Sequence, residues 1–149
     1  MKIALGCDHA GHILKDHVAS VIRAAGFEIL DCGCNGTSRV DYPDFAALVC
    51  KAMGDGKAQR GVLICGSGIG MSIAANKFSG IRATLCNDLY TARFSRLHND
   101  SNVLCLGGRI IGPDLATEIV TIWLQAEFEG GRHSGRLQKI AHLESNLKE

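Results

Sequence analysis

Five short apolar segments, each followed by a stretch with helical character, constrain the fold of this chain more than any other feature of its sequence. They are KIAL (2–5), FEIL (27–30), GVLIC (61–65), IRATLC (81–86) and NVLCLG (102–107). Segments that are apolar at nearly every position are typical of strands covered on both faces, and strands that alternate with helices pair in parallel through right-handed crossovers. The pattern predicts a three-layer α/β/α sandwich, Rossmann-like in type, around a five-stranded parallel sheet.

The segments between these runs carry helix signals of their own. After the first strand, Gly26 stands where a helix C-cap is expected, and four apolar residues recur before it at helical spacing: Leu14, Val18, Val21 and Ala25. Pro43 and Pro113, the only two prolines, fall where first helical turns accept them. No linker or repeat divides the 149 residues, so we expect a single domain over 1–149.

The end of the chain indicates a contact with a partner subunit. Residues 132–147 have the pattern of a terminal helix, with Leu137, Ile140 and Leu143 on one side. An apolar side on a terminal helix is expected to be buried, and we expect it to pack on the partner.

Charge and cysteine usage narrow the classes of function. Lysine and arginine total 16 against 15 for aspartate and glutamate, so the net charge of +1 gives no reason to expect nucleic acid as a partner. The first apolar run is too short for a secretion signal, and no later run is long enough to cross a bilayer. Seven cysteines without a Cys-x-x-Cys pair indicate reduced thiols. We therefore expect a cytoplasmic protein without a membrane partner.

The segment GVLICGSGIGMS, residues 61–72, is the first candidate site. Ligands of parallel α/β sheets bind beyond the carboxyl ends of the strands, and the segments GCDHAGH, CGSGIG, CNDLY and GGRIIG all follow predicted strands. Gly66, Gly68 and Gly70 would gather bare backbone N–H groups at a helix N-terminus, which favours an anion. A tight strand-to-helix turn is the alternative.

Three known phosphate-binding loops do not fit this segment. The dinucleotide fingerprint needs a third glycine where Met71 or Ile73 stands, and the nucleotide triphosphate loop needs a lysine that is absent. A cysteine-dependent phosphatase would need an arginine at the place of Met71.

Cys65 ends the third predicted strand, beside the amides of the glycine loop. A free thiol, with a pKa of about 8.5, is only a few per cent ionised at neutral pH. A thiol that acts as a base or nucleophile therefore needs neighbours that favour its thiolate, and the loop amides would do so. A buried, inert cysteine is the alternative.

Polar residues also follow the first strand. Asp8 and His9 would face the same crevice, where a carboxylate beside an imidazole suits proton transfer or the binding of sugar hydroxyls. A capping pair at the start of the first helix explains them equally well. His9 and His12 have His-x-x-His spacing, but no further ligands lie near them in sequence, so no metal site is expected.

Two further groups lie later in the chain. His98 and Asn99 precede the fifth strand, on a turn that could serve the site or only the fold. Arg132 and Arg136 would share a helical face and could grip a phosphate together, or could simply be solvated.

Taken together, five motifs make the chain similar to the ribose-5-phosphate isomerase B family, which includes allose-6-phosphate and galactose-6-phosphate isomerases. The motifs are GCDHAG, DYPD, ICGSGIGMSIAANKFSGIRA, RLHNDSNVLCLGGRIIG and EGGRHSGR, in register from Met1 to about Arg136. The resemblance implies interconversion of ribose 5-phosphate and ribulose 5-phosphate through an enediolate, with no metal or other cofactor. It also implies a homodimer, which could pair further into a tetramer, with sites near the subunit interface.

The resemblance implies a role for each motif. Cys65 matches the general base that moves a proton between C2 and C1, and His98 matches the acid that assists opening of the sugar ring. The remaining matches are the enediolate loop Gly66, Ser67, Gly68, Ile69 and Gly70; the substrate contacts Asp8, His9, Tyr42 and Asn99; and the phosphate contacts Arg109, Arg132 and Arg136, some of which could come from the neighbouring chain. Met71 stands where another branch of the family carries a glutamate base, so the chain is expected to follow the cysteine branch. Ser67 keeps the hydroxyl of the threonine that several relatives carry.

Two alternative functions remain open at this stage. An allose-6-phosphate or galactose-6-phosphate isomerase would use the same chemistry on a longer sugar. A catalytically silent module that binds sugar phosphates or nucleotides would keep the fold for regulation, although the base, the ring-opening histidine and the phosphate-binding arginines all occur together here.

Overall fold

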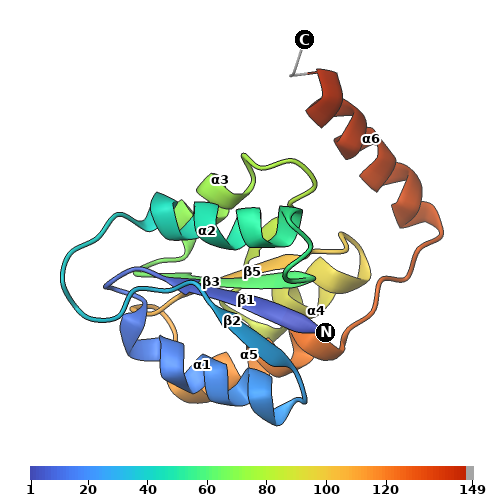
Figure 1. The fold of residues 1–149 in the computed structure, drawn as a ribbon. Coiled ribbons are helices and arrows are strands. Elements are labelled where there is room, and N and C mark those ends of the chain that lie inside the picture. Colours follow the sequence, from blue (N-terminus) through green and yellow to red (C-terminus); the bar gives the residue numbers. More distant parts are fainter. Residues whose placement is uncertain (147–149) are drawn as a thin grey trace.

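The five predicted strands form one parallel sheet, in the order β2-β1-β3-β5-β4 (Figure 1). The computed structural model describes residues 1–146. The strands are β1 Lys2–Cys7, β2 Glu28–Asp31, β3 Arg60–Cys65, β4 Ala83–Leu85 and β5 Val103–Gly107. The helices are α1 His12–Ala24, α2 Tyr42–Gly54, α3 Ile69–Ala75, α4 Leu89–Leu97, α5 Pro113–Gln125 and α6 Arg132–Asn146. The predicted fold class is therefore confirmed.

Alternate strand residues fill two separate cores, one on each face of the sheet. Leu5 and Cys7 of β1 belong to the core beneath α1, α4 and α5, whereas Ala4 belongs to the core beneath α2 and α3. In β3, Leu63 and Cys65 face α2 and α3. Because successive strand residues point to opposite faces, Cys7 and Cys65 end neighbouring strands but lie on opposite sides of the sheet.

The helices begin and end close to the positions predicted from the sequence, but the residues that α1 buries differ from the predicted set. Pro43 and Pro113 lie in the first turns of α2 and α5, as predicted. Gly26 lies just beyond α1 with a positive φ of 86°. The sequence pattern grouped Ala25 with the apolar residues of this helix. In the structure α1 ends at Ala24, and both residues are exposed. The residues that α1 buries are Leu14, Lys15, Val18, Ala19 and Ile22.

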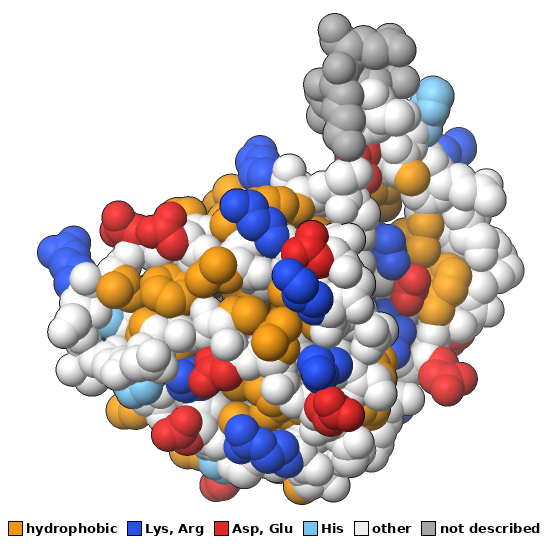
Figure 2. Space-filling view, in the orientation of Figure 1, with side chains coloured by type: hydrophobic (Ala, Val, Ile, Leu, Met, Phe, Trp, Pro, Cys, Tyr) orange, Lys and Arg blue, Asp and Glu red, His pale blue; other side chains and the backbone are white. Residues whose placement is uncertain are grey.

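Helix α6 projects from the body of the protein, at the end of the sheet opposite the loop between β2 and α2 (Figure 1). Ile140 and Leu143 on this helix are 50% and 64% exposed. Glu144 accepts a hydrogen bond from the N–H of Gly80 at 2.9 Å, and the predicted residue Leu147 lies outside the described residues. Figure 2 shows α6 as a separate projection, and acidic and basic side chains are interspersed over the face in view. None of the described helices is long and apolar enough to cross a bilayer.

An ionic cluster fixes the turn that leads from α4 into β5. Asp100 accepts hydrogen bonds from Arg96 at 2.7 Å and from Arg82 at 2.8 Å. Arg96 is only 5% exposed, and it also donates to the carbonyl of Ser101 at 2.6 Å. Asp100 has a φ of 44°, a left-handed conformation that aspartate and asparagine tolerate better than most residues. The buried guanidinium therefore depends on one carboxylate that is held in an unusual backbone conformation.

We predict that Asp100→Asn lowers the free energy of unfolding by about 1–3 kcal/mol, because a buried guanidinium loses its counter-charge while the backbone conformation remains accessible. The matched control is Asp55→Asn, which removes the carboxylate from an exposed pair with Lys57 at 2.9 Å and should cost less than about 0.5 kcal/mol. Urea unfolding of the two variants measures the difference. Equal costs would show that the Asp100 cluster does not stabilise the fold through its charge.

Candidate active site

A pocket of about 420 Å³ opens at the carboxyl ends of β1, β3 and β5. Strands β1 and β3 lie side by side with Cys7 opposite Ile64, and the chain winds away from this pair in both directions, which makes it the switch point where ligands of such sheets bind. The residues that line the pocket are Asp8, His9, Ala10, Tyr42, Cys65, Gly66, Ser67, Gly70, Arg109 and Ile110. Three of the segments that follow predicted strands, GCDHAGH, CGSGIG and GGRIIG, thus supply most of the residues that line this cavity.

The glycine loop directs a backbone donor at the sulfur of Cys65. The N–H of Gly68 donates to Cys65 Sγ at 3.1 Å, and α3 begins at the next residue. Gly68 has a φ of 78°, and a Cβ at this position would lie 2.5 Å from Leu85 Cδ1 and 2.9 Å from the carbonyl carbon of Leu106. Only glycine fits both the backbone conformation and the space. The sulfur of Cys65 is thus an acceptor of a backbone hydrogen bond, in a position fixed by the loop.

The environment of Cys65 differs from that of other buried cysteines. The sulfurs of Cys50 and Cys86 are donors, to the carbonyls of Ala75 and Thr84 at 3.9 Å in each case. Burial raises the pKa of both thiols to about 11. These thiols stay protonated and serve as small apolar residues, whereas Cys65 accepts an N–H at the edge of a cavity.

Asp8 and His9 line the same pocket and are held in place by the backbone. Asp8 Oδ1 accepts the N–H groups of Ala10 and Gly11, both at 2.9 Å, in the turn before α1. The N-cap of α1 is Gly11, which has no side-chain cap, so Asp8 does not cap the helix itself. The Nδ1 atom of His9 lies 3.3 Å from the N–H of Val40, on the loop between β2 and α2. Both side chains are thus oriented before any ligand arrives.

Arg109 and Tyr42 complete the wall. The Arg109 backbone N–H donates to the carbonyl of Gly66 at 3.0 Å, and within residues 1–146 its guanidinium makes no hydrogen bond or ion pair. The ring of Tyr42 packs so closely over Gly70 that a Cβ there would lie 2.6 Å from Tyr42 Cζ. The pocket therefore contains the guanidinium of Arg109, which has no hydrogen-bond or ion-pair partner within residues 1–146. Two of the predicted loop residues, Gly68 and Ile69, do not line the pocket.

The other predicted site residues lie at the opposite edge of the sheet. His98 and Asn99 precede β5, whose first residue, Val103, pairs with Gly61 at the start of β3. Gly61 is four residue steps from Cys65, or roughly 13 Å at about 3.3 Å per residue. Within one chain these residues do not share a pocket with Cys65. Arg132 and Arg136 lie on α6, at the same end (Figure 1).

His98 belongs to a cluster of its own. Its ring stacks on that of His133, with 4.2 Å between centroids, and Glu129 Oε2 lies 3.8 Å from His98 and 3.7 Å from His133. Arg132 Nε donates to His133 at 3.4 Å. Burial and the neighbouring His98 lower the pKa of His133. Glu129 and His133 were not among the predicted site residues, although both lie in the EGGRHSGR motif, which was the available signal.

Asp88, in the CNDLY segment, has a local task. Its carboxylate accepts the N–H of Thr91 at 2.8 Å and caps α4, and this hydrogen bond lowers its pKa. The CNDLY segment was expected to line the same crevice as Cys65, but none of its residues lines the pocket. Asp88 caps its own helix instead.

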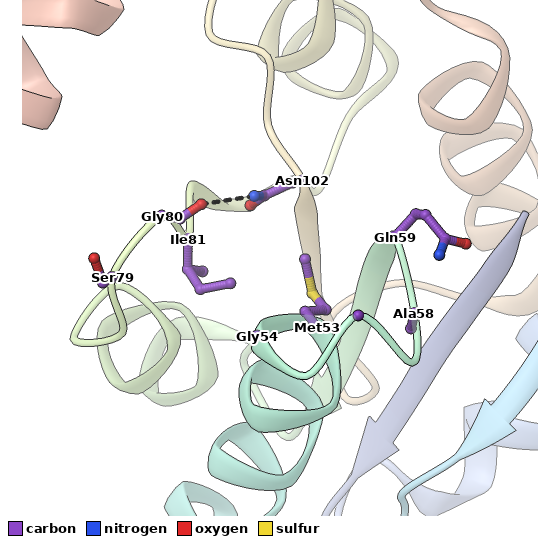
Figure 3. A pocket seen from close by; sticks show the side chains of 9 residues that line it. Met53, Gly54, Ala58, Gln59, Ser79, Gly80, Ile81 and Asn102 are labelled. Carbon is purple, nitrogen blue, oxygen red and sulfur yellow. Dashed lines mark hydrogen bonds between the residues drawn. The ribbon is translucent and has the colours of Figure 1, made fainter.

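A further hollow of about 370 Å³ lies at the amino edge of the sheet (Figure 3). Met53, Ala58 and Ile81 line it, and the side chain of Asn102 donates to the carbonyl of Gly80 at 2.8 Å. None of its lining residues is ionisable, so it offers neither an acid nor a base.

The chain is similar to known proteins over most of its length. Residues 3–140 match the profile of the Ribose/Galactose Isomerase family. The chain is 49% identical to "Ribose-5-phosphate isomerase B" of Escherichia coli strain K12, over 96% of each chain. It is 44% identical to "D-erythrulose-4-phosphate isomerase" of Pectobacterium atrosepticum, over 99% of this chain and 98% of the relative.

Solved structures are similar over nearly the whole chain. Ribose-5-phosphate isomerase B of Clostridium thermocellum has a TM-score of 0.96 and 50% identity, with 99% of each chain covered. The type B ribose 5-phosphate isomerase of Trypanosoma brucei has a TM-score of 0.93 and 48% identity, covering 95% of this chain and 97% of that one.

We predict that Gly68→Ala lowers the free energy of unfolding by about 2–4 kcal/mol, because it combines a left-handed backbone with overpacking in a dense region. Gly80→Ala is the matched control: Gly80 has a φ of 73°, but a Cβ there would meet nothing within 4 Å, so only backbone strain of about 1 kcal/mol is expected. Urea unfolding compares the two. If both variants lost the same stability, crowding at Gly68 would have no measurable role.

Proposed function

The chain belongs to the ribose/galactose isomerase family, and from this premise we propose that it interconverts ribose 5-phosphate and ribulose 5-phosphate, with Cys65 as the general base. The observation that carries the proposal is the Cys65 sulfur, held at a strand end by the Gly68 N–H and exposed to a pocket that Asp8, His9 and Arg109 also line. Two close relatives are named as isomerases of sugar phosphates.

The chemistry requires one base that reaches two neighbouring carbons. The hydrogen on C2 of an open-chain aldose phosphate is weakly acidic, because its removal leaves an enediolate with charge on the C1 oxygen. Cys65 takes this proton and returns it to C1, while a hydroxyl proton passes from the C2 oxygen to the C1 oxygen, so no proton or electron is gained or lost overall. We assign the backbone N–H groups of Gly66, Ser67 and Gly70, the loop residues that line the pocket, to the developing oxyanion, where fixed donors act most strongly. Asp8, His9 and Tyr42 are assigned to the sugar hydroxyls.

The phosphate does no chemistry but positions the reacting carbons. Its binding energy can be used to hold C1 and C2 against the sulfur. Arg109 is the cation that the pocket itself contains. Arg132 and Arg136, which resemble the phosphate-binding positions of the family, lie at the far edge of the sheet together with His98 and Asn99.

We therefore propose that a second copy of this chain completes the site. In a two-fold dimer, the carboxyl edge of one sheet faces the α4–α6 end of the other, and the same contact occurs twice. Each site then combines Cys65 of one subunit with His98, Asn99, Arg132 and Arg136 of its partner. The exposed apolar residues of α6, Ile140 and Leu143, are expected to pack on the partner in the same contact.

Longer or shorter sugar phosphates are the alternative substrates. Allose 6-phosphate and galactose 6-phosphate need the same proton transfer, and the relative named for D-erythrulose 4-phosphate favours including a four-carbon substrate in the comparison. The ratio of kcat/KM across these phosphates decides among them. Absence of turnover with all of them would instead favour a silent binding module.

We predict that Cys65→Ser lowers kcat for ribose 5-phosphate by about 10²–10⁴-fold, because a hydroxyl is a far weaker base than a thiolate. The control is Cys50→Ala, which removes a buried thiol that donates to a carbonyl and should leave kcat nearly unchanged. Ketose formation is measured with both variants after their folding is checked by circular dichroism. Near-normal turnover by Cys65→Ser would exclude Cys65 as the base.

We predict that two inactive variants restore activity when they share a dimer. Mixing Cys65→Ala with His98→Asn, followed by subunit exchange, gives hybrid dimers in which one site is intact and the other carries both changes. At equal amounts about one quarter of the wild-type activity should return, because half of the dimers are hybrids with one working site each. If Cys65 and His98 acted within one chain, no hybrid would have an intact site and the mixture would stay inactive.

A further inference from the structure

A second cluster of reactive side chains lies under α1, on the face of the sheet opposite Cys65. Cys7 ends β1, and Cys34 lies on the loop after β2; both are buried, and their sulfurs are 3.8 Å apart. One ring nitrogen of His12, the first residue of α1, lies within 4.8 Å of both sulfurs. Side chains from the end of β1, the start of α1 and the loop after β2 thus bring their ligand atoms together.

The backbone brings this loop unusually close to β1. A Cβ on Gly33 would lie 3.0 Å from Cys7 Sγ, so glycine permits the approach that places Cys34 beside Cys7. The backbone N–H of Cys34 donates to the carbonyl of Cys7 at 3.1 Å. Main-chain contacts therefore hold the two residues side by side, and the Cys34 thiol also donates to the carbonyl of Gly36 at 3.3 Å.

His12 gives the cluster the character of a ligand site. The Nδ1 atom of His12 is buried and has no hydrogen-bond partner within the described residues, which is costly for a polar atom unless a ligand binds that nitrogen. The ammonium of Lys15, only 5% exposed as a residue, donates to the carbonyl of Cys34 and to Asp31, both at 3.0 Å. The carboxylate of Asp31 pairs with this ammonium, so Lys15 brings no unpaired charge to the cluster.

We propose that Cys7, Cys34 and His12 bind a thiophilic divalent metal ion, with Zn²⁺ as the natural candidate. Two thiolates on a tetrahedral zinc, with Zn–S bonds of about 2.3 Å, are separated by about 3.8 Å, which is the separation found here. A disulfide would instead require the sulfurs to close to about 2.0 Å. Soft sulfur ligands with one imidazole select zinc over magnesium or calcium.

The binding step is balanced without any redox change. Zn²⁺ replaces the protons of two thiols, which pass to the solvent, and His12 binds through an unprotonated nitrogen. Three protein ligands leave the fourth tetrahedral position for water.

The position of the metal links it to the first pocket without entering the reaction. Cys7 directly precedes Asp8, and the loop that carries Cys34 continues to Val40, whose backbone contacts the His9 ring. A metal that joins Cys7 to Cys34 would hold this loop against β1 and so stabilise the wall that His9 and Tyr42 form. Its role is to stabilise this wall, and the proton transfer at Cys65 does not require it.

Titration of the fully reduced protein with Co²⁺ tests the proposal, since tetrahedral cobalt–thiolate centres give an intense sulfur-to-metal charge-transfer band. The band should appear with one equivalent, disappear on addition of Zn²⁺, and be lost in Cys34→Ser. Cys32→Ser, which removes a neighbouring thiol outside the cluster, is the matched control and should keep the band. The second histidine cluster, His98 with Glu129 and His133, has no sulfur and cannot produce it.

Thermal unfolding gives an independent measurement. At a hundredfold excess over its dissociation constant, Zn²⁺ should raise the melting temperature of the wild type and of Cys32→Ser by roughly 5–10 °C. It should raise that of Cys34→Ser and His12→Ala much less. No charge-transfer band in the reduced wild type, or an equal band in Cys34→Ser, would overturn the proposal. Neither readout depends on isomerase activity, so this result stands apart from the test of Cys65.

Discussion

The architecture of the pocket depends on how closely the backbone segments after β1, β3 and β5 approach one another. A side chain on Gly11 would collide with the carbonyl of Ile64, so these two segments meet through bare backbone. The N–H groups of Gly108 and Arg109 then donate to the carbonyls of Cys65 and Gly66 at 2.8 and 3.0 Å. Main-chain contacts of this kind are rigid and independent of rotamers, and they hold the backbones of Asp8, Cys65 and Arg109 at fixed positions around one cavity.

The sequence was sufficient for the sheet, because burial on both faces leaves a strong local signal. The four longer strands were predicted to within a few residues, whereas β4, at the edge, is only Ala83–Leu85 and half as long as its apolar run suggested. The buried face of α1 was misjudged at its C-terminal end, since the contact with β1 and α5 selects Ile22 rather than Ala25. A stripe of apolar residues does not show where the neighbouring elements stop.

The candidate site was predicted unevenly, for a physical reason. Residues that directly follow a strand, such as Asp8 and Cys65, share an edge because parallel strands all end on the same side. His98 precedes its strand, so the same rule places it at the opposite edge, and only a contact between chains could unite it with Cys65. The Cys7–Cys34 pair was not predicted at all. Its members are 27 residues apart, and they meet because β2 pairs with β1 and the following loop turns back over it.

Helix α6 is a fifteen-residue segment that leaves the body of the protein with few neighbours. A helix of this length is marginally stable in water by itself, and Gly135 near its start lowers its intrinsic stability further. In an isolated chain its amide protons would exchange with solvent after local opening that requires little free energy, long before those of the central strands. If a second copy covers α6 as proposed, the position of Arg136 depends on that contact between chains rather than on the folding of one chain.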